Sequence, residues 1–113
     1  MKLNLQDNLS YMIRVNGEWV PAMPAGEEFS PQQIRDYVAG PPWVICSTPD
    51  GYTLFQNLDA ASKGLPVNED GTLICTASGV SDSVRGRVFL AHPAHIPAFW
   101  KTLPSETNAE RRS

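Results

Sequence analysis

Prolines and glycines recur so often in this chain that no helix or strand can run far. Ten prolines and eight glycines stand among 113 residues. Proline lacks the backbone N–H that helices and sheets use, and glycine weakens both kinds of element, so each interrupts a regular segment. This punctuation argues against a bundle of long helices. It predicts a compact arrangement of short strands, turns and short helices.

The length and the composition correspond to one small globular domain. Hydrophobic residues make up 42% of the chain and charged residues 19%, a balance typical of a folded rather than a disordered protein. A chain of this size buries one modest core and leaves little room for a deep substrate cavity. We expect a loose leader over residues 1–9, a single domain over residues 10–103 and a disordered tail over residues 104–113.

The clearest hairpin signal lies between residues 43 and 57. A run of apolar residues at 43–48 suits a strand that is buried on both faces. Pro49-Asp50-Gly51 supplies a turn, because proline fixes φ, aspartate bonds to nearby backbone and glycine accepts positive φ. Residues 52–57 then return as the second strand.

Another hairpin is predicted nearer the N-terminus. Residues 11–15 form its first strand, and Asn16-Gly17 predicts a type I′ turn, in which both central residues have positive φ. Residues 18–20 return. Pro21 keeps the returning strand short and favours an edge position in the sheet.

A helix is predicted to begin just after Ser30. The Ser30 side chain can cap the first turn, and Gln33 stands three residues later, as a capping box requires. Phe29 and Ile34 occupy the two positions of a hydrophobic staple. Gly40 fits the left-handed position after the last turn. The helix should therefore be two to three turns long.

The rest of the domain is predicted as turns and strands. Glu69-Asp70-Gly71 indicates a turn, the apolar and β-branched residues 72–77 a strand, and residues 85–91 the last strand. The order of hairpin, helix, hairpin and closing strands predicts an α+β fold. Its sheet would be antiparallel or mixed, with about four to six strands. One short helix would pack on a face.

Short turn-rich motifs follow one another through residues 29–91. They are Tyr37-Val38-Ala39-Gly40, Trp43-Val44-Ile45, Asp50-Gly51-Tyr52, Asn57, Gly64-Leu65-Pro66-Val67-Asn68 and Arg85-Gly86-Arg87-Val88-Phe89-Leu90. This series resembles a family of small uncharacterised domains that occur mainly in phages and their bacterial hosts. The resemblance implies an accessory role on a mobile element, such as a part in conflict between phage and host.

Asn57 and Asn68 flank the Gly-Leu-Pro connector and are candidate ligand contacts. An amide side chain bonds both backbone N–H and C=O groups. The two asparagines therefore either hold the backbone of the connector in place or line a polar pocket for a ligand.

Arg85 and Arg87 are candidate contacts for a small anion. They alternate across Gly86, so in a strand they would share one face. Arg14 or Lys63 could join them in an anion pocket. The alternative is that both arginines lie on the solvent face of the strand. A site is expected where this strand meets Asn57 and Asn68.

A metal site is the weaker of two readings of the histidines and cysteines. His92 and His95, with Cys46 and Cys75, would complete a four-ligand zinc set. Neither cysteine belongs to a C-x-x-C pair, however, and Pro93 makes the histidine pair a rigid loop. We therefore expect buried free thiols in a reducing cytoplasm, with no metal and no cofactor.

A hydrolase can be drawn from Ser47 or Ser78, His92 or His95, and Asp82. No G-x-S-x-G elbow and no glycine-rich phosphate loop supports it. Enzymatic activity through a histidine is therefore kept as the alternative to a noncatalytic protein.

Charge and hydropathy argue against two classes of partner. The net charge is −3 and the chain has no basic block before Arg111-Arg112, which argues against duplex nucleic acid. No apolar run reaches the length of a membrane span. Residues 11–15 or 85–91, as edge strands, could pair two copies into a homodimer or a higher oligomer.

The sequence thus favours a small noncatalytic binding protein of the cytoplasm. It would bind a protein partner or sequester a small anionic ligand, with a nucleotide as one example. A small enzyme and a structural oligomer subunit are the alternatives.

Overall fold

A computed structural model of the chain describes residues 9–96. The leader expected over residues 1–9 falls outside this part except for Leu9, and so does everything expected after Ile96. The elements are, in chain order, β1 (Ser10–Ile13), β2 (Trp19–Ala22), α1 (Pro31–Val38), β3 (Pro42–Ser47), β4 (Thr53–Asn57), α2 (Glu69–Ala77), β5 (Val88–Ala91) and a 3-10 turn, η1 (Pro93–His95).

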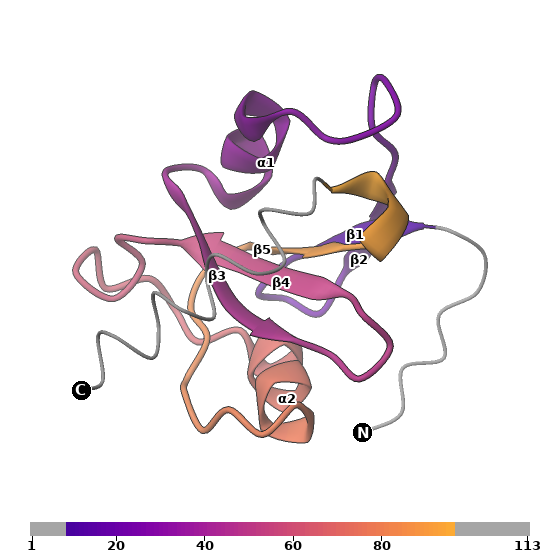
Figure 1. Cartoon of the computed structure of the whole chain (residues 1–113). Helices are drawn as coiled ribbons and strands as arrows, with labels where there is room; N and C mark the ends of the chain where they lie inside the picture. Colours follow the sequence, from indigo (N-terminus) through magenta and orange to yellow (C-terminus); the bar gives the residue numbers. More distant parts are fainter. Residues whose placement is uncertain (1–8, 97–113) are drawn as a thin grey trace, which may run out of the picture.

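The predicted α+β class is confirmed. Five strands form one antiparallel sheet in the order β2-β1-β5-β4-β3. Figure 1 shows α1 on one face of this sheet and α2 on the other. The prediction of a single helix is wrong, because a second helix covers the opposite face.

The last strand in the chain is the central strand of the sheet. β5 pairs with β1 on one side and with β4 on the other, and all four of its residues are buried. The expectation that residues 11–15 and 85–91 form edges is therefore wrong. β2 and β3 end the sheet instead, and Pro21 lies in β2, where a missing donor on the outer side costs nothing.

The core consists of two layers, one on each face of the sheet. Side chains alternate along a strand, so neighbours enter different layers. Phe55 and Phe89 pack toward α1, whereas Leu54 and Leu90 pack toward α2. The prediction that the strand at 43–48 is buried on both faces is confirmed for its central residues, Val44, Ile45 and Cys46.

The start of α1 forms as its sequence predicts. The Ser30 hydroxyl accepts a hydrogen bond from the Gln33 N–H, and the Gln33 side chain accepts one from the Ser30 N–H. The end differs from the prediction. Ala39, not Gly40, takes the left-handed conformation, with φ of 61°. Gly40 is needed for another reason, since a Cβ there would lie 2.5 Å from Asn57 Nδ2.

Helix α2 replaces the predicted turn at 69–71 and strand at 72–77. The Asn68 side chain caps the helix by accepting from Gly71 N–H. Glu69 and Asp70 lie in the first turn, where negative charge suits the helix dipole.

The buried side of α2 explains why its apolar residues form a helix. Gly71, Ile74 and Cys75 are buried and recur at positions i, i+3 and i+4. Gly71 packs closely against Val84, which leaves no room for a Cβ. The β-branched composition suited a strand, but burial on one helical face decides the structure.

The two hairpins share one turn geometry. In each, the first loop residue donates to the fifth and the fourth donates back to the first, over residues 14–18 and 48–52. Gly17 and Gly51 both have φ of +93°. Asn16 does not have positive φ, so the predicted type I′ turn is wrong. Both loops fit a type I turn followed by a glycine bulge.

Replacing Gly40 by alanine should destabilise the fold by about 2 kcal/mol. The new Cβ would meet Asn57, whose amide is held by two hydrogen bonds and cannot move cheaply. Urea denaturation measures the effect. Gly26→Ala is the control, because apart from its chain neighbours no heavy atom of residues 9–96 lies within 4 Å of its Cβ position. Equal denaturation midpoints for both variants would contradict the assigned packing.

Candidate functional site

The four residues predicted to bind a ligand do not meet at one point. Asn57 and Arg87 bond to the C-terminal end of α1, through Ala39 O and through Asp36 O and Tyr37 O. Asn68 and Arg85 bond to other backbone groups, around the connector that precedes α2. The structure therefore divides the predicted site into two sets of backbone contacts.

Asn68 is fully buried and uses its amide to join three parts of the chain. Its Nδ2 donates to Ile13 O at 3.0 Å and to Gly86 O at 2.9 Å. Its Oδ1 accepts from Gly71 N at 3.0 Å. Both amide protons are thus used within the fold, and the reading in which Asn68 holds backbone in place describes the structure.

Asn57 has the same role at the end of β4. Nδ2 donates to Ala39 O at 3.0 Å, and Oδ1 accepts from Asp59 N at 2.8 Å. The side chain is almost wholly buried against Gly40. Asn57 thereby fixes the chain between α1 and β3 to the end of the neighbouring strand.

Arg85 and Arg87 do not share a face of a strand, which corrects the prediction. Gly86 has φ of +75°, and β5 begins only at Val88. Arg85 Nη1 donates to Leu65 O at 3.0 Å. Arg87 turns the other way, donating from Nε to Tyr37 O at 2.6 Å and from Nη2 to Asp36 O at 2.8 Å.

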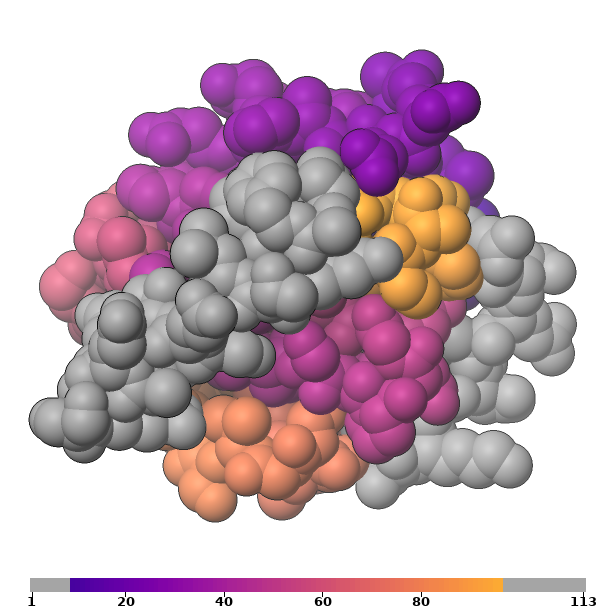
Figure 2. Space-filling model, in the orientation of Figure 1, coloured from indigo at the N-terminus to yellow at the C-terminus, as the bar shows by residue number. Residues whose placement is uncertain are grey.

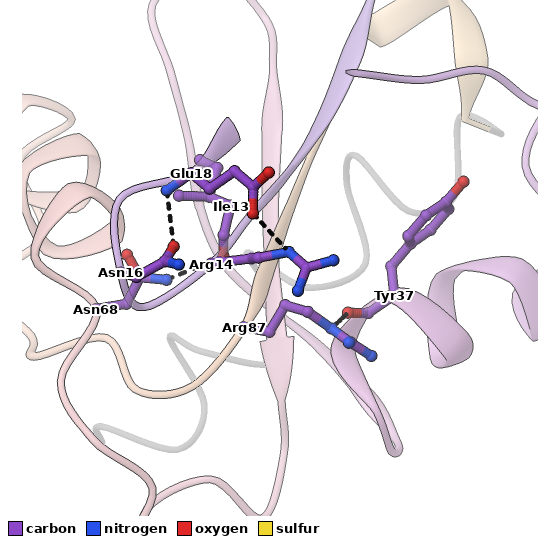
Figure 3. A network of polar contacts seen from close by, with 7 residues as sticks. All are labelled: Ile13, Arg14, Asn16, Glu18, Tyr37, Asn68 and Arg87. Atoms are coloured by element: carbon purple, nitrogen blue, oxygen red, sulfur yellow. Dashed lines mark hydrogen bonds and ion pairs between the residues drawn. The ribbon is translucent and has the colours of Figure 1, made fainter. Parts of the chain in front are cut away.

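Arg87 lies opposite a second arginine. Ile13 pairs with Val88 across β1 and β5, and Arg14 and Arg87 are the next residues beyond this last pair, just outside the two strands. In Figure 3 the two side chains extend in the same direction, Arg87 toward the carbonyl of Tyr37. Arg14 was one of the two residues expected to join an anion pocket. Lys63, the other, lies exposed in the turns after β4.

One carboxylate accompanies this arginine pair. Arg14 Nε lies 3.2 Å from Glu18 Oε1, and the two side chains are 49% and 58% exposed. This leaves the two terminal nitrogens of Arg14 without a hydrogen bond to any residue between 9 and 96. Those nitrogens form a planar set of donors that suits a phosphate or carboxylate.

The two histidines lie beside Ser10, which the sequence did not identify as a partner. Ser10 Oγ is 3.0 Å from His95 Nδ1 and accepts from His92 N at 2.8 Å. More than 80 residues separate Ser10 from both histidines, and only the position of β5 next to β1 brings them together. Figure 2 shows η1 between the segment before α1 and the β3–β4 hairpin.

Burial makes the pairing of serine and histidine structural. Ser10 is 0% exposed and His95 is 7% exposed, so a bulky substrate cannot contact the hydroxyl in this conformation. The predicted hydrolase set does not form around His95, because the structure pairs it with Ser10, while Ser78 Oγ donates to Ile74 O. Burial lowers the pKa of His95, because the charged form loses its hydration.

The cysteines and histidines do not form the alternative zinc site. Cys46 and Cys75 lie in the core layer beneath α2, whereas His95 packs against Phe29 in the layer beneath α1. Between residues 9 and 96, no group of three or more histidine, cysteine or acidic side chains is placed to hold a metal. The four-ligand reading is therefore wrong.

Comparisons of the chain with protein-family models, with curated proteins and with solved structures found no match. The resemblance to phage-borne domains stays a prediction. In the part of the chain that the structure describes, no helix is long and apolar enough to cross a membrane.

Replacing Asn68 by alanine should lower the free energy of unfolding by about 3 kcal/mol. The substitution removes the side-chain hydrogen-bond partner of two backbone carbonyls and one N–H, all at a buried position. Asn16→Ala, which removes one exposed bond to Glu18 N–H, should cost less than about 1 kcal/mol. Equal losses in urea denaturation would show that Asn68 does not join the three segments.

Acidification should weaken the fold through His95. Its pKa is lower in the folded than in the unfolded chain, so the unfolded state binds more protons as pH falls. The free energy of unfolding keeps its full value at a pH well above the ordinary histidine pKa of about 6.5, and it decreases as the pH falls below that pKa.

Thermal denaturation between pH 7.5 and pH 5.5 measures this effect (a window above the ordinary range of carboxylates, about 4). In His95→Gln the midpoint should depend less on pH, because glutamine can still bond to Ser10 but does not titrate. An unchanged pH dependence would assign the loss to another group.

Proposed function

We propose that this protein is a small noncatalytic binding protein that takes a small anionic ligand at the Arg14–Arg87 pair. The observation that supports the proposal is the position of the two arginines next to the last pair of β1 and β5, with their side chains extending in the same direction (Figure 3). Two like charges close together repel, and the exposed carboxylate of Glu18 offsets this at Arg14 only through Nε. An anion bound between the two arginines would offset this repulsion.

The surroundings of the two arginines favour Arg14, rather than Arg87, as the residue that donates hydrogen bonds to a ligand. Arg87 already donates to two carbonyls at the C-terminal end of α1, where the helix dipole is negative. Arg14 has only the exposed carboxylate of Glu18, and exposed ion pairs contribute little. Arg14 would therefore provide the terminal donors, while Arg87 adds a fixed positive charge.

The ligand class that fits is a phosphate-bearing small molecule. A guanidinium group binds two oxygens of a phosphate or carboxylate side by side. A nucleotide is one such ligand, and sequestering it would not require a nucleophile or a base. The accessory role on a mobile element and the cytoplasmic location belong to this proposal. They rest on the resemblance and on the composition.

A protein partner is the second candidate, favoured by the outer side of α2. Leu73 is 52% exposed there, and its exposed neighbours Thr76 and Ala77 carry no charge. An interface on this helix would not involve the arginine pair. A homodimer through strand pairing, if it forms, would use a terminal strand of the sheet, β2 or β3.

Arg14→Ala should weaken phosphate or AMP binding at least tenfold, since a charge-assisted hydrogen bond contributes about 1.5–3 kcal/mol. Isothermal titration of the full chain with inorganic phosphate and with AMP measures it. Arg35→Ala is the control, because Arg35 is exposed on α1 and lies outside the pair.

The proposal fails if wild-type protein binds neither ligand, or if Arg14→Ala binds as tightly as wild type. A tenfold loss in both variants would also overturn it, since that result reflects overall charge. Binding of a protein partner should survive Arg14→Ala, which separates the two candidates.

A further inference from the structure

Two buried thiols face each other between the terminal strand β3 and helix α2. Cys75 Sγ donates to Cys46 Sγ at 3.3 Å, and the two residues are 29 positions apart in the sequence. Both are free cysteines. Cys46 is 6% exposed and Cys75 is 0% exposed. Neither thiol takes part in the proposed anion site.

Local structure on both elements directs the thiols toward each other. The register of β3 against β4 shifts between Val44 and Cys46, so Ile45 and Cys46 both enter the core layer beneath α2. Cys75 lies on the buried side of α2, next to Ile74. The pair is thus fixed by a strand irregularity and a helix that the sequence alone did not predict.

The contact makes the two thiols chemically unequal. The hydrogen bond from Cys75 lowers the pKa of Cys46, and the Ser78 hydroxyl lowers it further, against the effect of burial. The same hydrogen bond, together with burial, raises the pKa of Cys75. The directions of these shifts make Cys46 the candidate for the attacking sulfur and Cys75 the donor that contacts it.

We propose that Cys46 and Cys75 form a two-electron redox site that a small peroxide converts to a disulfide. Cys46 sulfur attacks one peroxide oxygen, the O–O bond breaks and water leaves, which gives a sulfenic acid. Cys75 sulfur then attacks the Cys46 sulfur, and the hydroxyl leaves as a second water with the Cys75 proton. The two thiols lose two electrons, and one hydrogen peroxide gains them.

The geometry favours closure of the bond. A disulfide requires a sulfur separation of about 2.05 Å, so the sulfurs must approach by roughly 1.3 Å. β3 has only β4 as a strand neighbour and ends the sheet, so a small shift there disturbs one ladder. The intermediate cannot persist in isolation, because Cys75 is already in contact with it.

The burial of the two thiols determines which oxidants can reach them. Hydrogen peroxide is close to water in size, so it needs much less space to reach Cys46 than a bulky reagent does. Bulky disulfides such as oxidised glutathione need much more space than 6% exposure of Cys46 allows. The folded protein should therefore react with peroxide and remain inert to glutathione disulfide.

The experiment treats the folded chain with hydrogen peroxide, then unfolds it in an alkylating reagent. Intact mass spectrometry should show a loss of about 2 Da and no alkylation. A non-reduced peptide digest should join the peptides that contain Cys46 and Cys75. Dithiothreitol should restore two alkylated thiols. The oxidised form should melt several degrees higher, because the cross-link restricts the unfolded chain.

Three comparisons make the result decisive. Cys75→Ser should accumulate oxygen adducts on Cys46 without a cross-link, and Cys46→Ser should leave Cys75 unmodified. Wild-type protein unfolded in urea should form the bond at least tenfold more slowly, because the fold supplies the proximity.

Four results would overturn the proposal. They are two fully alkylated thiols after peroxide treatment of the folded chain, oxygen adducts without a cross-link in wild type, a disulfide between two molecules, and equal rates in the folded and unfolded chains.

Discussion

The pairing of β5 with both halves of the chain is the constraint on which the structure depends. β5 lies between β1 and β4, and it is the only strand that joins the first hairpin to the second within the described sheet. Phe89 faces the α1 layer and Leu90 faces the α2 layer. The two core layers therefore share one strand, and neither hairpin can bury its faces without it.

Loops that turn sharply around such a sheet leave backbone carbonyls without a backbone hydrogen-bond partner, and buried carbonyls need a partner from within the protein. Asn57, Asn68 and Arg87 satisfy them, at the end of α1 and around the segment before α2. This explains why residues with ligand-like chemistry were found in structural roles. Side chains that bind backbone have few donors left for a ligand. Arg14, which does not have this burden, carries the proposed anion site.

The anion site and the thiol pair occupy different places in the fold. The arginines lie where β1 meets β5, beside the C-terminal end of α1. The thiols lie beneath α2, at the terminal strand β3. Between residues 9 and 96 the two sites share no residue, so changes at one site can be tested without altering the other. Figure 1 shows α1 and α2 on opposite sides of the sheet between them.

The sequence by itself determined the features that depend on residues close together in the chain. The capping box at Ser30 and the turns at Gly17 and Gly51 involve residues at most five positions apart, so local rules place them. Helix α2 escaped these rules because its apolar residues suit a strand equally well, until burial on one side selects the helix. Only the tertiary structure decided which distant side chains meet. Ser10 with His95, Arg14 with Arg87 and Cys46 with Cys75 all depend on strand order and register, which arise from packing over the whole chain.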